Sequence, residues 1–237
     1  MVDVFDEVEE QLAQDRYQEA FKKYGPWALG VALFIILGAS GWAGFNAWND
    51  ARHERASDAF FAALDYRDAG NTEQASAAFD TLREAGPSGY TTLALMQQAA
   101  LALEAGNNGE AADLFDQAAA STSDAVIRDL ATLKAVWARW DELSFADVEI
   151  RLSAMASGDT PYRSYALETI GVAAYRDGDY DRARLEFSEI ASPVAPDGTV
   201  GRRAFNALAL LNSLDASAAS ETSDETETPA AGEAGND

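Results

Sequence analysis

The sequence predicts an all-α protein, with one N-terminal transmembrane helix followed by a helical-repeat solenoid of about four helix pairs and a capping helix. Two observations lead to this fold class. Residues 24–49 form one uncharged and mostly apolar stretch. Beyond it, a glycine followed by Ala five residues later and Phe nine residues later recurs in steps of about 36 residues. A recurrence of this kind is typical of stacked repeats.

The composition excludes several classes of function. The 237 residues include 40 acidic and 17 basic side chains, for a formal net charge of −23, which disfavours nucleic-acid binding. There is no Cys, and His53 is the only histidine. Disulfides, thiolate chemistry and His-rich metal sites are therefore excluded. We expect a protein that is not an enzyme, without catalytic residues, metal ligands or cofactors.

The first expected element is a membrane-spanning helix over residues 24–49. A stretch of this length makes a helix of about 30–36 Å, long enough to cross a bilayer. Pro26 stands where the start of a helix tolerates proline. Lys22 and Lys23 precede the span, and they favour residues 1–23 inside the cell and the later chain outside. The alternatives are a cleaved signal peptide and a buried helix of a soluble protein.

Small residues recur every four positions within the span and would let another helix backbone approach closely. The alternative is that Gly and Ala are common in membrane spans without such a contact. The candidate contact residues are Ala39, Ser40, Ala43, Gly44 and Ala47.

The next expected elements are paired helices. Gly70, Gly106 and Gly178 mark three units, and their spacings of 36 and 72 residues leave room for one more unit near residue 142. That copy is degenerate, and Ala146 and Ile150 match the Ala and Phe positions if its turn is one residue shorter. In each unit a left-handed glycine ends the first helix, and the units stack because neither helix buries its apolar face alone.

The repeat spacing divides the chain after the span. Units are expected at roughly residues 56–88, 92–124, 128–158 and 164–196, with an unpaired capping helix over 200–214, within a repeat domain over 50–214. Residues 215–237 are rich in Ser, Thr, Ala and acids and lack basic and aromatic residues. This composition predicts a disordered acidic tail.

The repeated positions resemble the tetratricopeptide repeat. The Gly-Asp/Asn turn and the Ala and aromatic positions after it are signature positions of that family, and Tyr66, Pro87 and Gly171 also match it. The resemblance covers about residues 55–214 and departs in its 36-residue period and its poor third unit. It implies a solenoid fold and says little about function.

The order of the parts resembles a narrower family. A short acidic segment containing Asp6–Leu12, then Tyr24 and Gly25 at the membrane edge, one span and immediate helical repeats resemble the ancillary subunit of the bacterial Sec translocon. The resemblance implies a single-pass protein of the bacterial inner membrane, with a cytoplasmic N-terminus and a periplasmic repeat domain. The partners it implies are translocon subunits and periplasmic chaperones.

A stack of helix pairs has a concave face lined by the first helix of each pair. The family pattern places apolar, aromatic and arginine side chains on this face, with Val136 among the inward positions. We expect this face to be a peptide-binding groove. Arg139 and Trp140, which are adjacent and lie in the degenerate unit, would be its hot spot. The alternative is that the arginines offset helix dipoles and the aromatics pack between units. The candidate residues are Arg67, Met96, Leu103, Arg139, Trp140, Tyr165, Tyr175 and Arg176.

The sequence therefore predicts a non-enzymatic, membrane-anchored adaptor at the Sec translocon. Its groove would link the translocon to periplasmic folding factors or nascent chains. One alternative is a periplasmic tetratricopeptide scaffold that coordinates envelope growth or cell division. An enzyme, such as a periplasmic hydrolase, is an alternative from a different class.

Overall fold

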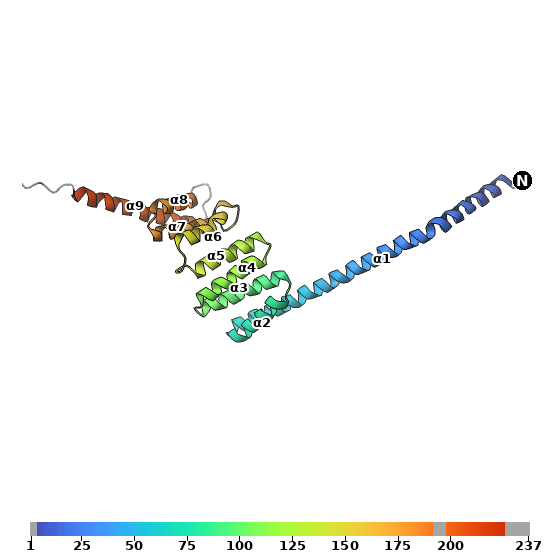
Figure 1. Cartoon of the computed structure of the whole chain (residues 1–237), viewed down its shortest axis with the longest axis horizontal. Helices are drawn as coiled ribbons and strands as arrows, with labels where there is room; N and C mark the ends of the chain where they lie inside the picture. Colours follow the sequence, from blue (N-terminus) through green and yellow to red (C-terminus); the bar gives the residue numbers. More distant parts are fainter. Residues whose placement is uncertain (1–3, 192–197, 226–237) are drawn as a thin grey trace, which may run out of the picture. The chain divides into compact units, whose positions relative to one another are not determined.

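The computed structural model describes residues 4–191 and 198–225, and within them every regular element is a helix. The all-α class predicted from the sequence is confirmed. The chain separates into two units, residues 1–58 and residues 59–237. Figure 1 shows the helices in chain order. The first unit is part of helix α1, and the second holds the repeats.

Helix α1 runs from Val4 to Asp68 and contains the whole predicted span. One candidate membrane-spanning helix, Leu29–Asp68, is long and apolar enough to cross a bilayer, and its most apolar window is not buried by the protein. Pro26 lies inside α1, so the prediction that it stands at a helix start is wrong. Proline lacks an amide hydrogen, so the helix loses one backbone hydrogen bond at this residue.

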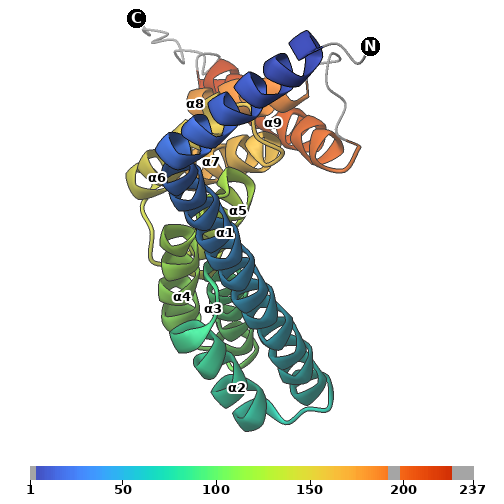
Figure 2. The same ribbon diagram turned by 90° about the vertical axis from the view of Figure 1, so that its right-hand side faces the viewer.

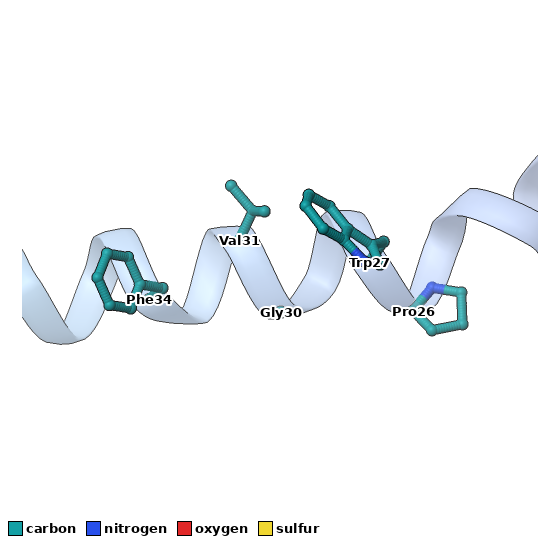
Figure 3. A pocket seen from close by; sticks show the side chains of 5 residues that line it. All are labelled: Pro26, Trp27, Gly30, Val31 and Phe34. Atoms are coloured by element: carbon teal, nitrogen blue, oxygen red, sulfur yellow. The ribbon is translucent and has the colours of Figure 1, made fainter.

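An apolar hollow lies along one side of α1 (Figure 3). Its lining residues are Pro26, Trp27, Gly30, Val31 and Phe34, all from this one helix. Gly30 has no side chain, so a notch remains between its larger neighbours. The lining is almost entirely apolar, which suits contact with hydrocarbon rather than with a polar ligand.

The second unit is a stack of helix pairs in which α3, α4 and α5 lie side by side and α7, α8 and α9 gather at the far end (Figures 1 and 2). The end of α1 is the first helix of the first pair, and α9 follows the fourth pair as a cap. This matches the predicted arrangement. The helices are α2 (Thr72–Ala85), α3 (Ser88–Glu104), α4 (Asn108–Ser121), α5 (Ala125–Ala138), α6 (Phe145–Ser157), α7 (Arg163–Asp177), α8 (Tyr180–Ile190) and α9 (Val200–Glu225).

Left-handed glycines end the first helix in three of the four pairs. Gly70, Gly106 and Gly178 have φ angles of 76°, 80° and 88°. At each turn, the glycine amide and the next amide donate to carbonyls of the last helical turn, as Asp179 N does to the Ala174 carbonyl oxygen at 3.0 Å. These bonds satisfy carbonyls that a helix end leaves without partners. The predicted turn geometry is therefore confirmed at these glycines.

The third pair keeps the repeat spacing, contrary to the prediction of a shorter turn. In the glycine-marked pairs, a buried small residue of the first helix is followed twelve residues later by the buried Ala of the second, as Ala99 is by Ala111. In the third pair the same interval joins Val136 to Val148, both fully buried. Leu152 then takes the position predicted for Ile150, which is 76% exposed.

The turn between the two helices of the third pair has a different structure. Helix α5 ends at Ala138, and residues 139–142 form turns before Ser144 caps α6. The Ser144 hydroxyl oxygen accepts from Asp147 N at 3.2 Å, and an Asp147 carboxylate oxygen accepts from Ser144 N at 3.1 Å. This reciprocal capping box satisfies amides at the helix start. It replaces the glycine turn of the other pairs.

Two clusters of buried side chains form the core, and α5 contributes to both. Ala131 and Ala135 pack with α3 and α4, whereas Leu133 and Val136 pack with α6 to α9. Helix α9 continues to Glu225, although the sequence predicts disorder from residue 215. Alanine and glutamate recur in that stretch and are strong helix formers. The rest of the predicted tail, residues 226–237, lies outside the described residues.

Candidate partner-binding groove

The pattern of burial separates first-helix side chains that pack in the core from those that can line the groove. Val136 is fully buried, so the prediction that it lines the groove is wrong. The next residue, Trp137, occupies the repeat position of Ala100 and Val172. Trp137 is 44% exposed and Val172 is 41% exposed. The α5 residues of the groove are therefore set one position later than the sequence suggested.

A hollow of about 230 Å³ lies between α5 and α7. It is lined by Trp137 and Trp140 from α5 and the turn after it, and by Glu168, Thr169 and Val172 from α7. Most of the exposed lining is apolar. The two indole rings are the largest side chains in this set, so the hollow offers flat aromatic surface to a bound group.

Hydrogen bonds hold the first indole in place. Trp137 Nε1 donates to the Thr169 hydroxyl oxygen at 3.0 Å, and that hydroxyl donates to the Tyr165 carbonyl oxygen at 2.7 Å. The Trp137 and Tyr165 rings meet edge to face, with centroids 6.3 Å apart. The indole N–H is thus satisfied within the protein, and the ring keeps its exposed face for a ligand.

Arg176 holds the second indole. Its guanidinium carbon lies 4.6 Å from the centroid of the Trp140 ring, a cation–π contact. The guanidinium also donates to the Trp140 carbonyl oxygen at 2.7 Å and to the carbonyl oxygen of Leu143. Among the described residues, Arg176 forms no ion pair with a carboxylate. It therefore ties the turn after α5 to α7 and leaves its charge unneutralised beside the hollow.

An ion pair joins Glu168, which lines the hollow, to Arg203 of α9. Arg203 Nε and Nη2 each donate to a different Glu168 carboxylate oxygen at 2.5 Å. The hydrogen bond to Glu168 raises the pKa of the Arg203 guanidinium. Glu168 is only 17% exposed, and its charge is matched by the bidentate pair. The capping helix is thus tied to a residue that lines the hollow.

Arg139 takes a different role from the predicted one. Its guanidinium donates to the carboxylate of Asp113 on α4 and lies 3.6 Å from Glu142 and 3.9 Å from Asp116. The hydrogen bond to Asp113 raises the pKa of Arg139. Three carboxylates already neutralise this cation, so it is not placed to hold the carboxylate of a ligand. Trp140 therefore stays a candidate for the hot spot, while Arg139 is engaged by carboxylates of its own chain.

Comparison with known protein families identifies the architecture. Residues 18–198 match the family described as the tetratricopeptide repeat-like domain. The chain belongs to this family. No curated protein and no solved structure matches it. The tetratricopeptide repeat-like match includes residues 24–49 as well as the repeats, so the candidate span lies inside the family region.

The remaining predicted residues of the tetratricopeptide repeat-like stack lie on α1, α3 and α7. Arg67 donates to the Gln97 side-chain oxygen at 2.5 Å, which joins the first pair to α3. Met96 is partly buried, and Leu103 is 38% exposed. The Tyr175 ring packs 5.5 Å from that of Tyr180, at the turn of the fourth pair. Contacts therefore join Trp140, Tyr165 and Arg176 to the hollow, while the other predicted residues lie outside its lining.

Sequence reasoning missed Trp137, Glu168 and Thr169. The signal for Trp137 was present, because the twelve-residue interval in the other pairs fixes the register of α5 once Val148 is recognised as the equivalent of Ala111. No repeat signal marks Thr169, whose role depends on the indole it binds. Within the described residues, no group of three or more His, Cys, Asp or Glu side chains is placed to hold a metal ion.

Proposed function

We propose that this tetratricopeptide repeat-like protein is a membrane-anchored adaptor at the bacterial Sec translocon. Its repeats would bind periplasmic folding factors or nascent chains, and its span would hold them near the translocon. The adaptor would carry out no chemistry of its own. The hollow between α5 and α7 is the observation that carries this proposal.

The hollow has the character of a binding site for a protein segment. Its surface consists of exposed indole and aliphatic groups. Both indoles are held in place, Trp137 by a hydrogen bond and Trp140 by the Arg176 guanidinium. Tryptophan is enriched among the residues that contribute most to protein interfaces. A site that is already ordered loses less conformational entropy when a partner binds. Stacked helix pairs use such concave surfaces to bind proteins.

The candidate span supports the anchored part of the proposal. We propose a cytosolic segment over residues 1–23, a span over 24–49 and a periplasmic repeat domain over 50–214. The small residues Ala39, Ser40, Ala43, Gly44 and Ala47 are exposed on α1. Such a surface would let a translocon helix approach closely. The order of acidic segment, span and repeats supports the choice of the translocon as partner.

Site-specific photo-crosslinking tests the proposal. A photoreactive residue would replace Val172, in the hollow, in the full chain expressed in bacterial membranes. The matched control would carry the same residue at Ile150, which is 76% exposed on α6. Crosslinked proteins would be identified by mass spectrometry after purification in mild detergent.

Translocon subunits, periplasmic chaperones or secreted chains crosslinked from position 172 and not from position 150 are the expected result. Cell-wall synthases crosslinked in their place would favour the envelope-growth scaffold. Identical crosslinks from both positions would remove the hollow from the account of binding.

A further inference from the structure

The charges around the hollow indicate which kind of peptide segment it accepts. This inference rests on the proposed adaptor function. We infer that the hollow receives an aliphatic or aromatic side chain from a peptide segment whose neighbouring residues are Lys or Arg. The apolar lining of the hollow specifies the buried side chain. The carboxylates on the same face specify the charge of its neighbours.

The size and lining of the hollow fit one or two apolar side chains. Its volume of about 230 Å³ is below the roughly 300 Å³ at which pockets begin to enclose drug-sized molecules. Trp137, Trp140 and Val172 supply the apolar surface, and the Trp137 N–H and the Thr169 hydroxyl are already hydrogen-bonded to each other. A polar ligand group would therefore gain few hydrogen bonds there, whereas an apolar group loses unfavourable contact with water.

The repeat places a row of carboxylates beside this surface. Arg176, which lies over the Trp140 ring, occupies the same repeat position as Asp68, Glu104 and Asp141 in the three preceding pairs. Three of the four pairs thus carry an acid at this position. Asp68 is paired with the neighbouring Arg67 at 2.8 Å. Glu104 and Asp141 are exposed and form no ion pair with a described residue.

Several acids on the second helices of the later pairs are neutralised by ion pairs. There, arginines bridge successive units, as Arg151 of α6 does to Asp116 of α4 and Arg182 of α8 does to Glu149 of α6 at 2.9 Å. Arg151 and Arg182 thus neutralise carboxylates of α4 and α6. Glu104 and Asp141 keep their charge, so the face that holds the hollow attracts cations.

Arg176 favours one orientation of the bound segment. Its positive charge lies over Trp140 in the fourth pair, whereas Glu104 and Asp141 belong to the second and third pairs. A segment with its apolar side chain in the hollow therefore meets repulsion if its basic residues extend toward α7. It meets attraction if they extend toward α3. The repulsion by Arg176 therefore disfavours the orientation in which the basic residues of the segment extend toward α7.

Peptide binding to the full chain tests this inference. The protein would be held in nanodiscs of phosphatidylcholine, whose zwitterionic surface does not attract basic peptides, and empty nanodiscs would be subtracted. The probes are short fluorescent peptides. One is built from Leu, Phe and Lys, a second replaces each Lys with Glu, and a third replaces each Leu and Phe with Ser. Fluorescence anisotropy gives each Kd.

We expect the Lys peptide with Leu and Phe to bind about tenfold or more tightly than either counterpart at low salt, with the gap narrowing as salt screens the charges. Glu104→Lys combined with Asp141→Lys should reverse the preference between the Lys and Glu peptides. The matched control is Glu73→Lys with Glu84→Lys, which changes the net charge equally at exposed sites on α2. This control should leave the preference for the Lys peptide in place.

Equal affinity for the Lys and Glu peptides would overturn the inference, as would a control variant that reverses the preference equally well. Val172→Gln, which puts a polar side chain in the hollow, separates this failure from failure of the adaptor function. If it abolishes both peptide binding and the co-purification of partners with the full chain in mild detergent, while charge has no effect, the groove stands and the inference falls. If it binds peptides and recovers partners as the unaltered protein does, both proposals fall.

Discussion

Single residues set the conformation of this repeat domain at two kinds of position. Glycines take the left-handed turns that end the first helices. Glycine also permits a close approach at Gly171, where an added Cβ would lie 2.9 Å from the Phe187 ring. The buried aromatic of α8 thus packs directly on the backbone of α7. Both roles depend on the absence of a side chain, and no other residue type meets either without strain.

Gly178→Val should destabilise the repeat domain. The φ angle of 88° is unfavourable for a β-branched residue, although no atom lies within 4 Å of the added Cβ. The expected loss is on the order of 1–3 kcal/mol in the free energy of unfolding, from backbone strain alone. Denaturant unfolding would measure it. Gly109→Ala at the start of α4, where space is also open, should leave stability unchanged or raise it, and equal effects of the two changes would contradict this account.

Glu186 should make the domain less stable as pH rises. Its side chain is 5% exposed on α8, and burial raises its pKa although Arg182 lies 2.8 Å away. A carboxyl with a raised folded pKa contributes stability below its unfolded pKa of about 4.3 and loses it as pH rises through the folded value. Glu186→Gln should therefore raise the unfolding midpoint at pH 7 to 8, with a difference that closes toward pH 4. Exposed Glu73→Gln should show no such convergence.

At the scale of the elements, the pairs that the sequence predicted well are those marked by glycine. A left-handed turn requires a particular residue type, so the pattern reveals the turn. The third pair has no glycine at its turn. Its sequence suggested that Ala146 and Ile150 pack between the helices, whereas Val148 and Leu152 are the buried residues. The ion pairs of Arg139 were hidden for another reason. Its partner Asp113 is far away in sequence and becomes a neighbour only when the helices stack.

Leu152→Ala should destabilise the domain far more than Ile150→Ala if the third pair is in the register described. Leu152 is fully buried in α6, so its truncation removes apolar contacts and leaves a cavity. The expected loss is about 2–5 kcal/mol in the free energy of unfolding. Ile150 is 76% exposed, and its truncation should change stability by no more than about 0.5 kcal/mol. A larger loss at Ile150 than at Leu152 would restore the register first read from the sequence.

Over the whole molecule, charge and apolar surface are separated along the chain. Residues 24–49 contain no charged side chain, and beyond them Arg52 lies over the Trp48 ring at 5.2 Å, where charged residues resume. The repeat domain that follows carries most of the ion pairs within the described residues. A chain with this order can be held at a membrane by its first part while its second part remains in water.

The orientation of the chain should be N-terminus inside and repeat domain outside. Lys22 and Lys23 lie directly before the span, and positive residues next to a span are retained in the cytoplasm. Long acidic domains impose little constraint of their own, so we expect the two lysines next to the span to favour this orientation. A phosphatase fused after Glu225, at the end of α9, should be active, and a reporter that functions only in the cytosol should be silent there. Lys22→Glu with Lys23→Glu should weaken this bias, while Arg202→Glu, exposed in α9 far from the span, should not. Activity of the cytosolic reporter in the unaltered chain would place the repeats, and the hollow between α5 and α7, out of reach of every periplasmic partner.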